Sequence, residues 1–215
     1  ERRENILDQP LILQLERMAE LALALAEGHE TLANTIWPEV LSYDFWQITA
    51  DVVWRINWQS RQSGEPWTSI LLNDEKLNPI ASLFLRLAAS LPVSSLEEQI
   101  DCLIGLPDAT AKLKLPAASP LYDYYFGPAA RQEAHSFTAL ISDLVVLRRR
   151  LGEWRRGHSR PAGLRAFVEF AEGHRAAGLN ILNTSPYHET DEAVNLLTAY
   201  GAKGDGITMN TKNIQ

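Results

Sequence analysis

Residues 5–27 read NILDQPLILQLERMAELALALAE, and this stretch predicts a long α-helix. Its apolar side chains recur in steps of three and four residues, which places them on one helical face. The recurring positions are Leu11, Leu15, Met18, Ala22 and Leu25. Pro10 marks a break or a first-turn position, and Gly28 follows where a left-handed residue commonly ends a helix.

The helical period returns along most of the chain. We expect two short helices around a turn within residues 35–62, a capped helix that begins at Ser94 or Ser95, and helices over 67–72, 79–91, 129–156 and 164–177. Residues 106–120 contain three prolines and little periodicity, which predicts a surface connection. The chain is therefore predicted to be all-α, an irregular helical bundle.

A different pattern stands near the C-terminus, where residues 193–204 read AVNLLTAYGAKG. Residues 194–198 resemble a short buried strand that runs into a turn of small residues around Lys203. A single strand cannot pair its own backbone groups, so we expect its sheet partners to lie outside this chain. The tail over residues 205–215 is expected to be disordered.

Composition narrows the class of protein. The 215 residues include one cysteine, Cys102, within an apolar run, which predicts a buried thiol and a reducing, cytoplasmic setting. No apolar run approaches the roughly 18 residues that a membrane span needs. The formal net charge of −7 argues against a protein that coats nucleic acid by bulk charge. Because the chain begins without Met inside an expected helix, we expect an excised fragment.

Sequence motifs for self-contained catalysis are missing. The chain has no G-x-x-x-x-G-K-[ST] phosphate loop, no G-x-S-x-G and no H-E-x-x-H. Its five histidines are scattered, and the acidic residues beside His188 are interpreted as a solvated loop. We therefore expect no catalytic residue, no metal site and no cofactor within this chain.

One basic segment contrasts with the acidic chain. Seven arginines and Trp154 lie between residues 148 and 165 against a single acidic residue, Glu153; the arginines are Arg148, Arg149, Arg150, Arg155, Arg156, Arg160 and Arg165. This cluster could contact phosphates. It could equally be a solvated helix end that the helix dipole favours.

Four of the six tryptophans fall within residues 35–62, at positions 37, 46, 54 and 58. Tryptophan can stack on nucleic-acid bases. At helical spacing among apolar residues, however, these side chains are predicted to belong to the core.

Both ends of the chain resemble one family. Glu1–Asp8 read ERRENILD and resemble the E-R-x-E-I-x-D helix in the second RecA-like core of UvrD/Rep/PcrA superfamily 1A DNA helicases. Asn195–Gly204 read NLLTAYGAKG and resemble motif V of that family, L-M-T-x-H-x-x-K-G-L-E-F. Ser119–Phe126 and Asn180–Glu189 also resemble the UvrD-like branch. In that family a large helical accessory domain, called 2B, is inserted between the two ends.

The resemblance implies a division of the chain. Residues 1–30 would be a helix of the second motor domain, 31–190 a 2B-like accessory domain, 191–204 the return to the motor domain and 205–215 a tail. Thr198 and Tyr200 would lie near the single-strand backbone, and Lys203 and Gly204 would couple to the nucleotide site.

This sequence also departs from the family pattern. Tyr200 replaces the motif's His, and Asp205-Gly206-Ile207 follow Gly204 where Leu-Glu-Phe is expected. The family's R-G-I-G turn for gripping duplex is absent, and the tryptophan-rich block occupies its position.

The resemblance implies a regulatory, DNA-contacting domain of an ATP-dependent 3'-5' helicase for DNA unwinding and repair. The expected DNA-contacting residues are Arg148, Arg149, Arg150, Trp154, Arg155, Arg156, Thr198 and Tyr200. ATP and Mg²⁺ would belong to the parent helicase. The expected partners are DNA at a single-strand/duplex junction and the rest of the motor, with no membrane.

Two alternatives remain open. The chain could be a protein-interaction or autoinhibitory helical scaffold, which its net negative charge favours. It could also be a helical domain of a RecB/AddA-type helicase-nuclease.

Overall fold

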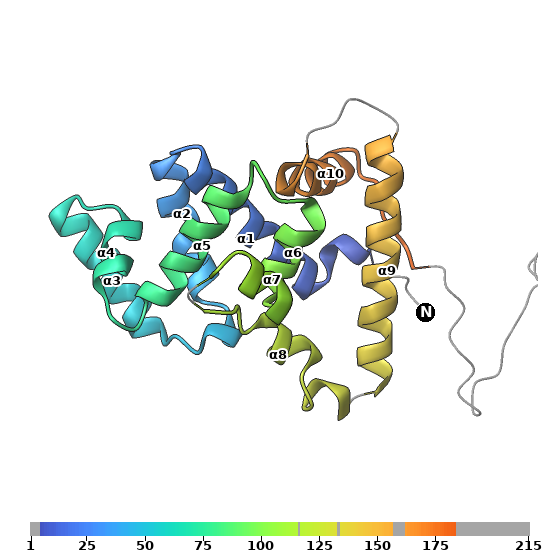
Figure 1. Cartoon of the computed structure of the whole chain (residues 1–215), viewed down its shortest axis with the longest axis horizontal. Coiled ribbons are helices and arrows are strands. Elements are labelled where there is room, and N and C mark those ends of the chain that lie inside the picture. The colour runs from blue at the N-terminus through green and yellow to red at the C-terminus, as the bar shows by residue number, and fades with distance from the viewer. Residues whose placement is uncertain (1–4, 116, 133, 157–161, 184–215) are drawn as a thin grey trace, which may run out of the picture. The chain divides into compact units, whose positions relative to one another are not determined.

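The helix predicted from the opening stretch, α1 (Pro10–Ala26), lies at the centre of the bundle (Figure 1). It contacts α2, α5, α6 and α10, so helices from both ends of the chain pack around it. Pro10 occupies its first turn, where the missing N–H group costs nothing. Gly28 adopts the predicted left-handed conformation at φ +68°.

The computed structural model describes residues 5–115, 117–132, 134–156 and 162–183, which fall within one compact unit. Its elements besides α1 are α2 (Glu30–Leu41), α3 (Ala50–Ser63), α4 (Trp67–Asn73), α5 (Asn78–Ser90), α6 (Leu96–Ile104), α7 (Pro107–Lys112), α8 (Leu121–Phe126), α9 (Ala134–Arg156), α10 (Leu164–Ala176) and the 3₁₀ turns η1 (Ile6–Asp8), η2 (Asp44–Trp46) and η3 (Ala130–Gln132). Over these residues the all-α prediction is confirmed. An isolated antiparallel bridge joins Asn5 to Leu182.

Large aromatic side chains fill the core between these helices. Trp37 of α2 is fully buried, meets Phe84 of α5 edge to face at 5.4 Å, and donates its indole N–H to Thr68 Oγ1 at 2.9 Å. Phe167 and Phe170 of α10 are equally buried on the other side of α1. Burial of such rings supplies much of the apolar driving force for folding.

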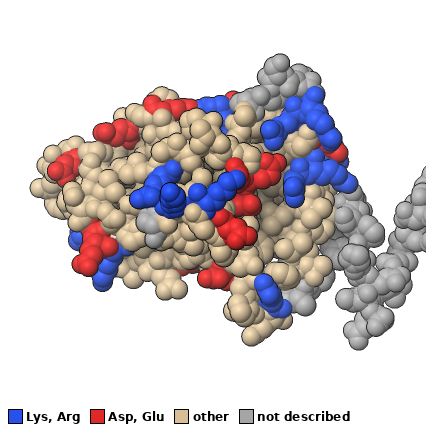
Figure 2. Space-filling model, in the orientation of Figure 1, with Lys and Arg blue, Asp and Glu red and all other residues tan. Residues whose placement is uncertain are grey.

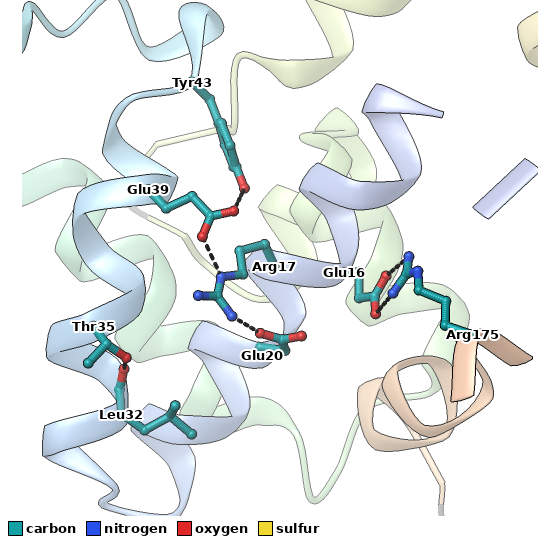
Figure 3. A network of polar contacts seen from close by, with 8 residues as sticks. All are labelled: Glu16, Arg17, Glu20, Leu32, Thr35, Glu39, Tyr43 and Arg175. Atoms are coloured by element: carbon teal, nitrogen blue, oxygen red, sulfur yellow. Dashed lines mark hydrogen bonds and ion pairs between the residues drawn. The ribbon is translucent and has the colours of Figure 1, made fainter. Parts of the chain in front are cut away.

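Ion pairs and hydrogen bonds connect α1 to α2 and α10 (Figure 3). Glu16, which is 3% exposed, accepts two hydrogen bonds from Arg175 of α10 at 2.5 and 2.6 Å. Arg17 lies one residue on and pairs with Glu20 at 2.5 Å and with Glu39 of α2 at 2.8 Å. Burial raises the pKa of Glu20, although Arg17 opposes that shift.

Helix ends follow local capping rules. Of the two registers predicted for the capping box, the Ser95 register forms: Ser95 Oγ accepts from Glu98 N at 3.2 Å, and Glu98 accepts from Ser95 N at 2.9 Å. Gly178 has φ +64° just after α10, as expected for a residue that ends a helix.

Proline content misleads the prediction at one place. The surface connection expected over 106–120 contains α7, with Pro107 in its first turn. Of the two short helices predicted within residues 35–62, the first is the end of α2, which continues through Pro38 to Leu41, and the second is α3; the turn between them contains η2. An interior proline removes one backbone hydrogen bond. Burial of the flanking Trp37, Val40 and Leu41 offsets that loss.

The prediction that the tryptophans share one core is wrong for Trp54 and Trp58. Their exposed fractions are 67% and 56%. Helix α3 packs mainly on α4 and to a lesser degree on α2, and its one buried residue is Ile56. Since Trp54 and Trp58 each lie two residues from Ile56, they occupy the opposite helical face.

Several predictions lie outside the described residues: the strand over 194–198, motif V, and the tail over 205–215. The proposed domain boundaries at residues 30 and 190 stay predictions. Among the described helices, none combines the length and apolar character that crossing a membrane requires.

Candidate nucleic-acid interface

Helix α9 carries most of the predicted DNA-contacting residues. Its inner face is apolar: Val146, Leu147 and Leu151 are buried and hold the C-terminal half of the helix against the bundle. Trp154 continues this face and meets Phe170 of α10 edge to face at 5.8 Å. The apolar period therefore directs the intervening arginines outward.

The middle of α9 has a second anchor. Asn183 donates its side-chain amide to Ser142 Oγ and to Asp143 Oδ1, each at 2.8 Å. Residues far apart in the chain thus hold α9 in place below its basic end.

Arginines gather on the outer surface of the last two turns of α9 (Figure 2, upper right). Arg148, Arg149, Arg150 and Arg156 are exposed, and Arg155 is partly exposed. The pairs 148/155 and 149/156 are seven residues apart, which is nearly two helical turns. Each pair therefore forms a row whose members are separated by about 10.5 Å along the axis.

Nearby carboxylates neutralise only part of this cluster. Arg150 Nη1 lies 3.3 Å from Glu153 Oε2, both exposed. Arg165, which follows in the sequence cluster, forms an ion pair with Glu27 at the end of α1. Within the described ranges, no ion pair joins Arg148, Arg149, Arg155 or Arg156 to a carboxylate.

Asp101 of α6 interacts electrostatically with Arg148 of the cluster. Burial raises the pKa of Asp101, and the positive charge of Arg148 partly counteracts that rise. Arg148 therefore lies close enough to α6 to interact electrostatically with it, whereas Arg149 and Arg156 face solvent.

The structure brings six predicted site residues together on α9, namely Arg148, Arg149, Arg150, Trp154, Arg155 and Arg156. The packing of Trp154 on Phe170 gives its indole a structural place between α9 and α10. Thr198, Tyr200, Lys203, Gly204 and Arg160 lie outside the described residues.

A metal-binding cluster and a reactive thiol are two other kinds of site that the described part of the chain could contain. No group of three or more His, Cys, Asp or Glu side chains converges there in a way that could hold a metal ion. Cys102 is fully buried, and burial raises the pKa of its thiol to about 11.

Sequence reasoning missed one surface feature, the exposed tryptophans of α3. A signal was present, because Trp58 is surrounded by Asn57, Gln59, Ser60 and Arg61, a polar neighbourhood that suits a solvent-facing helix. Comparisons of the chain with protein-family models, with curated proteins and with solved structures give no match.

Proposed function

We propose that this chain is a DNA-contacting accessory region of a cytoplasmic superfamily 1A-type helicase that acts in DNA unwinding and repair. The observation that carries the proposal is the cluster of arginines at the C-terminal end of α9, in which Arg149 and Arg156 face solvent and Arg148 and Arg155 lie beside them. The resemblance of both ends of the chain to motor-domain segments supplies the helicase context.

The arginine rows suit a phosphate backbone better than base edges. Guanidinium groups bind phosphates through paired N–H donors, and such contacts position a protein without reading sequence. The net charge of −7 repels DNA, so binding of DNA by the whole chain depends on this local cluster of arginines. Affinity should accordingly be weak and strongly dependent on salt.

In this proposal the chain supplies DNA contact and the rest of the helicase supplies the chemistry. ATP and Mg²⁺ would bind to the motor domains, where Lys203 and Gly204 would couple the chain to the nucleotide site. The isolated chain should therefore hydrolyse no ATP, since it has no phosphate loop. ATP hydrolysis by the purified chain would contradict this assignment.

The test is a titration of the 215-residue chain with fluorescently labelled forked DNA over a series of salt concentrations. Four phosphate contacts predict that log Kd changes by about three to four units per decade of salt. The variant Arg149→Glu/Arg156→Glu should lower that slope by about two units, because each lost contact removes about one.

A matched control carries the same change of charge elsewhere. Arg61→Glu/Lys76→Glu alters two exposed basic residues of α3 and the α4–α5 turn and should leave the slope unchanged. If both variants weaken binding equally, bulk charge explains the binding. If the α9 variant binds like the parent chain, the arginine rows do not contact DNA.

A further inference from the structure

Helix α3 lies at the end of the bundle away from α9 (Figure 1). It carries two solvent-exposed tryptophans, Trp54 and Trp58. The Trp54 and Trp58 rings stack on each other at 5.8 Å with only 10° between their planes. Trp54 is 67% exposed and Trp58 is 56% exposed, although tryptophan is usually largely buried. Tryptophan is also enriched among the residues that contribute most to binding in protein interfaces. A stacked, exposed aromatic pair of this kind points to a binding surface.

A groove of about 460 Å³ lies beside Trp54, between α3 and the segment that follows α2. Its apolar walls come from Pro38, Ile48, Val53 and Trp54. This volume falls within the range of natural ligand sites. The groove therefore combines one aromatic side chain, Trp54, with apolar side chains around it.

Polar groups along the groove are neutral or acidic. The rest of its lining is Ser42, Ala50, Asn57 and the exposed Asp44, and none of the lining residues is Lys or Arg. The neighbouring Arg55 is paired with Asp74 at 3.1 Å. Nucleic acid needs cations for its phosphates, so the charge of this groove favours a polypeptide that carries a cation.

We propose that the groove binds a proline-containing extended segment of a partner protein with an Arg or Lys beside the prolines. Such a segment forms a polyproline II helix, whose backbone carbonyls remain free to accept hydrogen bonds. The indole N–H of Trp54 and the side-chain amide of Asn57 are suitable donors, whereas the Ser42 hydroxyl already donates to the Glu39 carbonyl at 2.6 Å. Asp44 would pair with the basic residue.

Other peptide modes fit less well. Addition of a β-strand requires an exposed sheet edge, and the groove is formed by helices and a 3₁₀ turn. A docked amphipathic helix would place an apolar face in the groove, whereas Ser42, Asp44 and Asn57 give this lining a polar side. Prolines lying against a tryptophan need only a short aromatic groove, as in other polyproline-binding domains.

The test uses the full chain, labelled with ¹⁵N, and the synthetic peptide APPPRPPPPA as the probe. Nuclear magnetic resonance should show shifts of the indole N–H signals of Trp54 and Trp58, assigned with Trp54→Phe and Trp58→Phe. The signal of the buried Trp37 should stay in place. Peptides with alanine in place of the prolines should produce no shift.

Variants separate the two elements of recognition. Trp54→Ala should weaken peptide binding at least about tenfold, and its exposure makes the fold insensitive to the change. Asp44→Asn should weaken binding of the arginine peptide about threefold but leave an arginine-free proline peptide unaffected. Val93→Ala, at another exposed apolar residue, should change neither affinity.

Three results would overturn the proposal. The first is the absence of indole shifts at millimolar proline peptide. The second is an equal response to oligo-deoxythymidine, which would favour base stacking on the tryptophans. The third is concentration-dependent self-association that Trp54→Ala abolishes, which would make a second copy of the chain the occupant.

Discussion

Replacement of Arg175 by methionine should be among the most damaging single changes to this fold. Arg175 holds the buried Glu16 carboxylate through two hydrogen bonds at 2.5 and 2.6 Å. It also donates to the Leu7 carbonyl at 3.0 Å. Methionine keeps most of the side-chain volume but leaves a buried charge without its partner.

The structure sets the magnitude of this effect. Loss of one member of a buried ion pair costs about 3–5 kcal/mol, because the remaining charge is neither solvated nor paired. Glu16 meets that condition, since its side chain is only 4% exposed. Removal of both charges in Glu16→Leu/Arg175→Met should recover about 2 kcal/mol or more of that loss.

The neighbouring Arg17 provides the matched control. Arg17→Met removes ion pairs with Glu20 and Glu39, whose side chains are 22% and 50% exposed. Water reaches Glu39 freely and Glu20 in part, so the cost should be about 1 kcal/mol, well below that for Arg175→Met. The free energy of unfolding is measured by urea denaturation, followed by circular dichroism at pH 7. Equal losses for Arg175→Met and Arg17→Met would refute the argument from burial.

The burial of Cys102 and the close approach of Gly105 to Ser119 lead to further expected results. Alkylation of Cys102 by iodoacetamide in the native state should be about a hundredfold slower than in urea, because burial raises the thiol pKa from 9.0 to about 11. Since the folded state then binds this proton more tightly, the free energy of unfolding should fall as pH rises above 9; a labelling rate that urea does not change would contradict this. Gly105→Ala should destabilise the fold by about 3 kcal/mol or more, because Gly105 has φ +92° and an added Cβ would overlap the Ser119 carbonyl oxygen. Gly64→Ala, at φ +74° with open space around it, should cost only about 1 kcal/mol; thermal unfolding of both variants tests the difference.

The candidate site could be predicted only in part. The arginine run and the apolar period of α9 together predict a helix with outward-facing arginines, because both depend on spacing within the helix. The pairing of Arg165 with Glu27 could not be foreseen, since the two residues are distant in sequence. The same holds for Trp154, whose contact with Phe170 depends on how α10 folds back onto α9.

The exposed tryptophans show why residue type alone misleads. Trp37 and Trp54 both stand among apolar neighbours, yet one is fully buried and the other is 67% exposed. The difference arises because α2 packs against the central helix α1, whereas α3 packs mainly on α4 at the edge of the bundle. Sequence spacing specifies a shared face of a helix, but it does not specify what that face meets.

The sequence by itself determined the all-α class, most helix positions and the caps at Gly28 and Gly178, because these depend on residues within about one helical turn. It limited the cap of α6 to Ser94 or Ser95, and the structure selected Ser95. Tertiary structure alone decided that α1 is the central helix and that Glu16 meets Arg175, 159 residues away. It also decided which tryptophans and arginines face solvent. Such contacts arise from packing between helices, where burial and charge pairing act over distances that local spacing does not encode.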